Sequence, residues 1–136
     1  MSKSDSDSNS RIQLTDPADL ISRKLRKAVT DSTSLVSYDP VKRPGVSTLL
    51  DIDSACTGRD PEEISESCLL RYMDTGEYKK EVARLLIEHL APIQKKYLEL
   101  INDKVYLRKC LDEGANKASR IAALNLDRIC EIIGMK

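Results

Sequence analysis

A stripe of apolar side chains at helical spacing runs through the second half of this chain and constrains its fold more than any other feature. Between Tyr78 and Ile101 apolar residues recur every three or four positions, which is typical of one face of an α-helix. Pro92 lies inside the stripe, where it favours a kink rather than two separate helices. We therefore predict one long helix that starts near Gly76. Its apolar face comprises Tyr78, Val82, Leu85, Leu86, His89 or Leu90, Ile93, Tyr97 and Ile101.

The first helix signal along the chain covers residues 14–32. Thr15 or Asp16 can cap this helix, and Pro17 suits its first position because proline has no N–H to leave unpaired there. The expected apolar face is Ile21, Leu25 and either Ala28 or Val29.

Three or four further helices are expected outside these two. Residues 34–45 read as a connecting loop, because Pro40 and Pro44 forbid regular helix across that segment. A helix follows over residues 44–58, and another begins with Asp60 as its cap. Residues 102–134 hold one or two more helices.

Composition supports helices packed on helices. The 136 residues are 40% hydrophobic, yet they include no Phe, no Trp and only five Gly. The length is that of a single domain. We predict an all-α bundle of five or six helices, preceded by a flexible loop rich in Ser and Asp.

Charge is balanced overall but clustered locally. The 22 Lys and Arg equal the 22 Asp and Glu, so net charge by itself indicates neither a nucleic acid nor a membrane as partner. Two clusters on expected helices are either solvated faces or phosphate-binding faces. They are Arg23, Lys24, Arg26 and Lys27, and then Lys79, Lys80 and Arg84.

Cysteine and histidine usage argues against a metal site. The four cysteines are far apart, with no C-x-x-C pair, and His89 is the only histidine, so we expect no zinc site. We expect small, buried thiols in a reducing compartment and a packed or half-exposed His89. The cysteines are Cys56, Cys68, Cys110 and Cys130. No apolar run reaches membrane-spanning length, and no signal or transit peptide is evident.

The opening stretch, MSKSDSDSNS, has the composition of a disordered tail. However, Met1-Ser2-Lys3-Ser4 matches the last four residues of the Lys-Met-Ser-Lys-Ser signature of class I aminoacyl-tRNA synthetases. After it come, in order, SDSDSNSRIQLTDPADL, AVTDS, YDP, RPGVSTLLDI, LAPIQKKY and DEGANKASRIA. In this order the chain resembles the C-terminal portion of tryptophanyl-tRNA synthetases of the bacterial and mitochondrial branch, over essentially all 136 residues.

The resemblance implies roles for the opening residues. In such enzymes the amino acid's carboxylate attacks the α-phosphate of ATP, and negative charge grows on the departing pyrophosphate. A cation on a mobile loop that meets this charge only in the transition state lowers the barrier. Lys3 is the expected catalytic residue, and Ser2 and Ser4 are expected to bind ATP beside it. The motif's first lysine is missing, and Ser6 stands where the family often has proline.

The resemblance also divides the chain. Residues 1–15 would be the ATP loop and linker, expected to be disordered in isolation, and residues 16–136 a helical domain that binds the tRNA anticodon. The catalytic domain that binds ATP (with Mg²⁺) and tryptophan would precede Met1. We therefore expect this piece to be monomeric, to bind no cofactor and to lack catalysis alone, within a homodimeric parent. A mitochondrial matrix location is favoured, with a bacterial-type cytoplasmic one as the alternative.

Two other hypotheses stay open at this point. The chain could be a free-standing helical interaction module with a disordered serine-rich tail, or an all-α domain without any nucleic-acid role. Within the tRNA hypothesis, Tyr72 and Tyr106 are expected to pack against the domain rather than to stack on bases.

Overall fold

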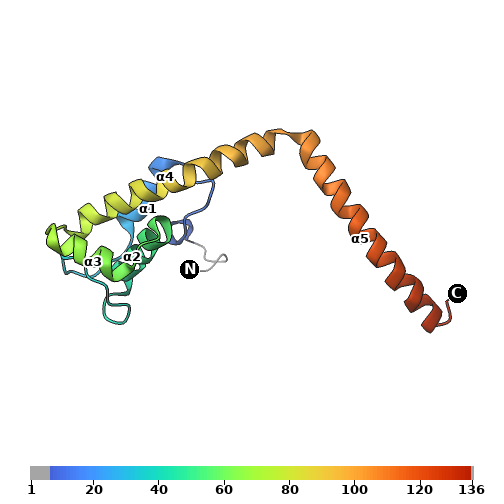
Figure 1. Ribbon diagram of the computed structural model, residues 1–136, viewed down its shortest axis with the longest axis horizontal. Coiled ribbons are helices and arrows are strands. Elements are labelled where there is room, and N and C mark those ends of the chain that lie inside the picture. Colours follow the sequence, from blue (N-terminus) through green and yellow to red (C-terminus); the bar gives the residue numbers. More distant parts are fainter. Residues whose placement is uncertain (1–6, 136) are drawn as a thin grey trace. The chain divides into compact units, whose positions relative to one another are not determined.

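A computed structural model describes residues 7–135, and these residues form helices without a regular strand, as predicted (Figure 1). A 3₁₀ turn at Ser8–Ser10 precedes five α-helices. They are α1 (Ala18–Lys27), α2 (Pro44–Thr57), α3 (Pro61–Leu70), α4 (Thr75–Asn102) and α5 (Lys104–Ile132). The all-α prediction is confirmed.

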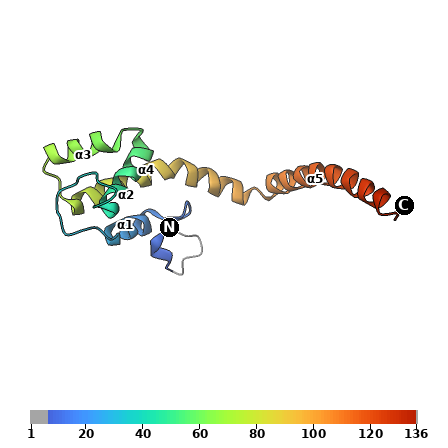
Figure 2. The ribbon, with the colours of Figure 1, turned by 90° about the horizontal axis from the view of Figure 1, so that it is seen from below.

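Contacts between residues divide the chain into two compact units, residues 1–94 and 95–136. The first unit holds the hydrophobic core, to which α1, α2, α3 and the first half of α4 contribute (Figure 2). Its buried members are Ile21, Leu25, Val36, Val46, Leu49, Leu50, Ile64, Cys68, Tyr78, Val82, Ala83 and Leu90. In the second unit, α5 has no buried residue.

Local sequence signals explain several helix ends. The Asp60 side chain accepts a hydrogen bond from the Glu62 N–H at 2.9 Å, which confirms the predicted cap of α3. Gly58 ends α2 with a φ of 75°, a conformation that suits glycine because it has no Cβ. The predicted start of α1 is wrong by one residue: Pro17 is the cap, α1 begins at Ala18, and Asp16 serves another purpose.

The long helix α4 continues through Pro92 as one element, as expected. Its first half is buried as predicted, through Tyr78, Val82 and Leu90. The second half is not, because Ile93, Tyr97 and Ile101 are each about half exposed. The predicted apolar stripe therefore lies on one helix, but it is buried only as far as Leu90.

The loop between α1 and α2 is fixed to the start of α4. Thr75 donates from its backbone N–H to the Ser34 carbonyl at 2.7 Å, and Leu35 forms an isolated antiparallel bridge with Asp74. A Cβ at Gly45 would collide with the Val29 carbonyl, so only glycine lets α2 begin this close to the end of α1.

Of the cysteines, Cys68 is buried as expected, Cys56 and Cys130 are partly exposed, and Cys110 is exposed, which contradicts the expectation of four buried thiols. His89 is exposed, so of the two expected states, packed or half-exposed, the packed one is wrong. Within residues 7–135, no three His, Cys, Asp or Glu side chains come together to hold a metal ion. In the same part of the chain, no helix combines the length and apolarity needed to cross a bilayer.

Candidate functional site

A cation-lined groove lies between α1 and α4. It encloses about 440 Å³ and brings together five of the seven cations that the sequence singled out. They are Arg23 and Arg26 of α1 and Lys79, Lys80 and Arg84 of α4. The remaining lining is Asp19, Ser22, Gly76, Ala83 and Ile87.

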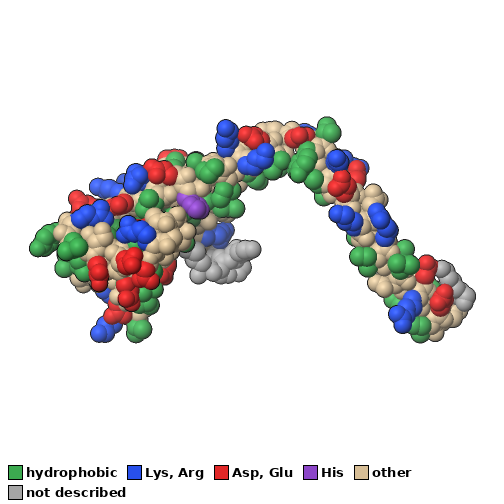
Figure 3. All heavy atoms as spheres, viewed as in Figure 1, with side chains coloured by type: hydrophobic (Ala, Val, Ile, Leu, Met, Phe, Trp, Pro, Cys, Tyr) green, Lys and Arg blue, Asp and Glu red, His purple; other side chains and the backbone are tan. Residues whose placement is uncertain are grey.

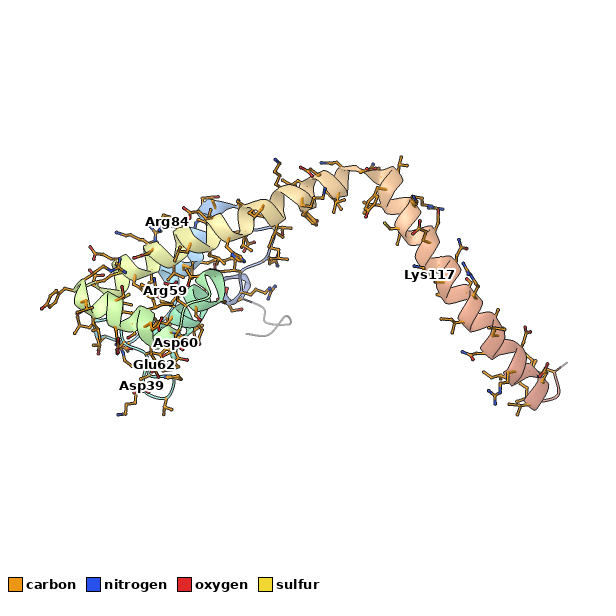
Figure 4. All side chains as sticks on the ribbon, in the orientation of Figure 1. Asp39, Arg59, Asp60, Glu62, Arg84 and Lys117 are labelled. Carbon is orange, nitrogen blue, oxygen red and sulfur yellow. The ribbon has the colours of Figure 1, made fainter. Side chains whose placement is uncertain are left out.

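The amphipathic pattern of each helix places these cations in the groove. On α1, Ile21 and Leu25 face the core, so Arg23 and Arg26 project elsewhere. On α4, Tyr78 and Val82 are buried, and Lys80 and Arg84, four residues apart, lie together on an exposed face. Figure 4 labels Arg84 on α4.

The ion pairs in the groove are weak and solvent-accessible. Arg23 lies 3.7 Å from Asp19, and Arg84 lies 3.0 Å from Glu88, with more than half of each side chain exposed. Among the residues that the structure describes, Arg26 and Lys80 make no ion pair. Anionic ligands could therefore displace or bypass these contacts at little cost.

Lys79 has a structural task as well as a place in the groove. Its Nζ donates to the Ala28 carbonyl at 2.8 Å and to Thr30 Oγ1 at 3.0 Å. The ammonium thus satisfies a carbonyl at the end of α1 and ties that end to α4. Its charge lies at the edge of the groove but is already hydrogen-bonded.

The remaining two cations of the first cluster do not join the groove. Lys24, expected to be solvated or to face phosphates, is 7% exposed and forms an ion pair with Asp16. That expectation is wrong because Lys24 lies one turn from Ile21 and so shares its buried side. Lys27 is exposed but lines a different hollow, together with Arg11 and Ile12.

Acidic side chains gather elsewhere on the first unit. The face shown in Figure 3 has Asp and Glu clustered over α2 and α3, and Figure 4 labels Asp60 and Glu62 at the start of α3. Along α4, cations and acids alternate in the same view. The groove between α1 and α4 is therefore a basic feature of the first unit, and a polyanion would be repelled near α3.

Of the predicted ATP-binding residues, Ser2, Lys3 and Ser4 all lie outside the described residues. The tyrosines differ from expectation. Tyr72 is 86% exposed and has a φ of 50°, so the prediction that it packs is wrong. Tyr106 is about half exposed.

Sequence reasoning missed a network just before α1. Asp16 is buried, and its partners include Lys24, the Gln13 backbone and, through its own carbonyl, Gln94. The sequence offers Thr15 or Asp16 as the cap of α1, because both precede Pro17. The only signal in the sequence was an acid, Asp16, eight residues before Lys24. That spacing does not predict an ion pair, because ion pairs within one helix are three or four residues apart.

Comparisons with known proteins agree on one family. A family sequence model described as tRNA synthetases class I (W and Y) matches residues 1–91. The tryptophan–tRNA ligase of Rickettsia conorii is 45% identical over an alignment of 136 positions, which covers 98% of this chain and 40% of that protein. The chloroplastic/mitochondrial tryptophan–tRNA ligase of Arabidopsis thaliana is 39% identical over 98% of this chain and 32% of its own length.

A solved structure shares the fold. Tryptophanyl-tRNA synthetase from Mycoplasma pneumoniae superposes with a TM-score of 0.74 at 24% identity, covering 100% of this chain and 41% of that one. The chain thus spans less than half the length of the relatives it matches. Because the family model covers more than half of the chain, the protein belongs to the class I tRNA synthetases of the W and Y group.

Proposed function

We propose that this chain is part of a tryptophan–tRNA ligase that uses ATP to join tryptophan to its tRNA. The observation that carries the proposal is the 45% identity to such a ligase over 98% of the chain. ATP (with Mg²⁺) and tryptophan would bind largely through the portion of the relatives that this chain does not span. For the location we propose the mitochondrial matrix, with a bacterial-type cytoplasm as the alternative; the relatives named above are one bacterial and one chloroplastic/mitochondrial protein.

Within that ligase, residues 1–15 would supply the ATP loop. The ammonium of Lys3 would meet the negative charge that grows on the leaving pyrophosphate, with the Ser2 and Ser4 hydroxyls as further donors. Residues 16–136 would bind the anticodon part of the tRNA. We also propose that this chain is monomeric by itself and that the complete ligase is a homodimer.

The groove between α1 and α4 is the proposed phosphate-contacting surface. Arg23, Arg26, Lys80 and Arg84 are exposed, and their ion pairs are absent or weak. Each phosphate that such a cation neutralises releases counterions, so binding weakens as salt rises. Lys79 already donates a hydrogen bond to the end of α1, so it would add positive electrostatic potential to the groove rather than contact a phosphate directly.

A salt-dependent titration tests this surface. The chain is titrated with transcribed tryptophan tRNA and with the same tRNA carrying a changed anticodon, between 50 and 200 mM KCl. Arg26→Met and Lys80→Met should each weaken binding and reduce the slope of log affinity against log salt by about 0.7 to 0.9. Lys27→Met is the matched control, since Lys27 is exposed on the same helix outside the groove.

The outcomes separate the hypotheses. Weaker binding to the changed anticodon supports the ligase. Equal binding to both tRNAs, or no salt slope, favours a helical interaction module or an all-α domain without a nucleic-acid role. If Lys27→Met lowers the slope as much as Arg26→Met does, the groove is not the contact surface.

A further inference from the structure

A buried ion pair connects the segment before α1 to α1 itself. Lys24 Nζ is 2.6 Å from Asp16 Oδ2, and the two side chains are 5% and 9% exposed. In the described part of the chain, no other ion pair has both side chains below a tenth exposed. Burying two charges costs free energy, and two apolar side chains would fill the same space. A buried ion pair is therefore better evidence that the local geometry is specified than that the fold is stabilised.

The pair holds the backbone that enters α1. Lys24 Nζ also donates to the Arg11 carbonyl at 2.8 Å. The Gln13 N–H donates to Asp16 Oδ2 at 3.0 Å, and the Asp16 N–H donates back to the Gln13 carbonyl at 3.0 Å. Together these bonds fix residues 11–16 against α1.

A third element joins the same anchor. Gln94 Nε2 of α4 donates to the Asp16 carbonyl at 2.9 Å. Burial alone would raise the pKa of Asp16, but the hydrogen bonds from Lys24 and from the Gln13 N–H outweigh it and lower that pKa. Asp16 therefore stays ionised at neutral pH and keeps its bond to Lys24.

The anchor lies between the two proposed functional parts of the chain. Arg23 and Arg26 of the groove are on the same helix as Lys24 but on its exposed side. Lys3 precedes the first anchored residue, Arg11, by eight positions in the sequence, and only that short stretch of chain joins the two. Whatever fixes Arg11 thus limits where Lys3 can act.

We propose that Asp16 and Lys24 are positioning residues for the ATP loop, which fix its base against α1 and α4. The inference rests on the proposed ligase function, because it gives Lys3 its task. In this proposal Lys24 and Asp16 are not catalytic residues, and they act on catalysis only through Lys3.

The test uses a chimera in which this chain replaces the matching 40% of the Rickettsia conorii ligase. The double variant Asp16→Leu with Lys24→Leu removes the anchor while leaving an apolar pair that keeps the site packed. Tryptophan-dependent exchange of pyrophosphate into ATP should lose at least tenfold in kcat. The KM for tryptophan should stay within twofold and the melting temperature close to that of the parent chimera.

A double-mutant cycle with Lys3→Ala separates positioning from general damage. If the anchor acts through Lys3, adding the Leu pair to Lys3→Ala should lower kcat by less than a further twofold. The reason is that both changes remove the same contribution, that of Lys3. Multiplicative losses, or full activity in the Leu-pair variant, overturn the proposal. Arg59→Met is the control, since Arg59 is an exposed residue between α2 and α3 with no part in the groove or the anchor, and it should leave pyrophosphate exchange unchanged.

Hydrogen exchange on the 136-residue chain decides the matter independently of activity. In the Leu-pair variant the Gln13 and Asp16 amides should exchange at least tenfold faster, whereas the core amides of α2 should not change. Unchanged exchange at both amides overturns the anchor. An unmodified chimera without activity contradicts the proposed function instead, and the exchange result still decides on the anchor.

Discussion

Arg43 shows how one side chain can organise a whole loop. Its guanidinium makes two parallel bonds of 2.9 Å to the Asp31 carboxylate. The same group donates to the carbonyls of Leu35 and Thr33 and to Ser37 Oγ, and its side chain is only 12% exposed. These bonds satisfy the hydrogen-bonding capacity of polar groups in the loop between α1 and α2, which forms no regular structure of its own.

The Asp31–Arg43 pair predicts a specific pH dependence of stability. The hydrogen bonds from Arg43 and from the Thr33 N–H lower the pKa of Asp31 from 3.8 to about 2. Because the folded-state value is the lower one, the contribution is complete above 3.8 and disappears as the pH falls through about 2. Asp31→Asn should therefore be less stable than the unmodified chain at pH 6, and the gap should close towards pH 2.

Urea unfolding of both chains between pH 6 and pH 2 measures that gap. Arg43→Met is the companion variant, in which NMR titration should find the Asp31 pKa shifted back towards its ordinary value. A gap that stays constant with pH would mean that Asp31 stabilises the loop by shape rather than by charge.

At the same scale, Lys24 shows what sequence reasoning could not predict. Four cations in five residues suggested one exposed face, but at 100° per residue they spread over about 160° of the helix, and Lys24 lies at the edge of that arc next to Ile21. Lys24 falls on the side of Ile21 and Leu25 and is tolerated there because Asp16 pairs with it. The partner comes from outside the helix, and local spacing does not reveal it.

At the scale of elements, helix ends and cationic faces were predictable from local chemistry. The Asp60 cap and the Gly58 stop follow from short-range hydrogen bonding and backbone freedom. The groove needed more, because Arg26 and Lys80 meet only when α1 packs against α4. Periodicity showed that each helix had an exposed basic face and left open which helices would be neighbours.

Pro92 yields a prediction about α4 itself. It is exposed, has no N–H to donate to the Glu88 carbonyl, and lies inside a continuous helix. Pro92→Ala should restore that bond and raise the free energy of unfolding by roughly 1 to 3 kcal/mol, read from urea unfolding followed by circular dichroism.

Pro61→Ala provides the comparison, because Pro61 occupies the first turn of α3, where an N–H has no helical partner. It should give no gain. If Pro92→Ala instead destabilises the chain, the bend that proline favours is required by the packing of α4, and the gain in hydrogen bonding is outweighed.

At the scale of the whole molecule, burial is distributed very unevenly. Residues 1–94 contain every member of the hydrophobic core, whereas α5 contributes no buried side chain over 29 residues. Large apolar side chains remain exposed on α5, among them Leu111, Ile121 and Ile129. Because helical stability in proteins comes mainly from packing of an apolar face, α5 should be the least stable helix.

Hydrogen exchange followed by mass spectrometry would show this difference. At low micromolar concentration, amides in α2 and the first half of α4 should exchange only through global unfolding, and those of α5 orders of magnitude faster. Repeating the experiment at tenfold higher concentration is the control. Protection of α5 that is equal to that of α2 at both concentrations would contradict the prediction, and protection that appears only at the higher one would show that a second copy covers its apolar side chains.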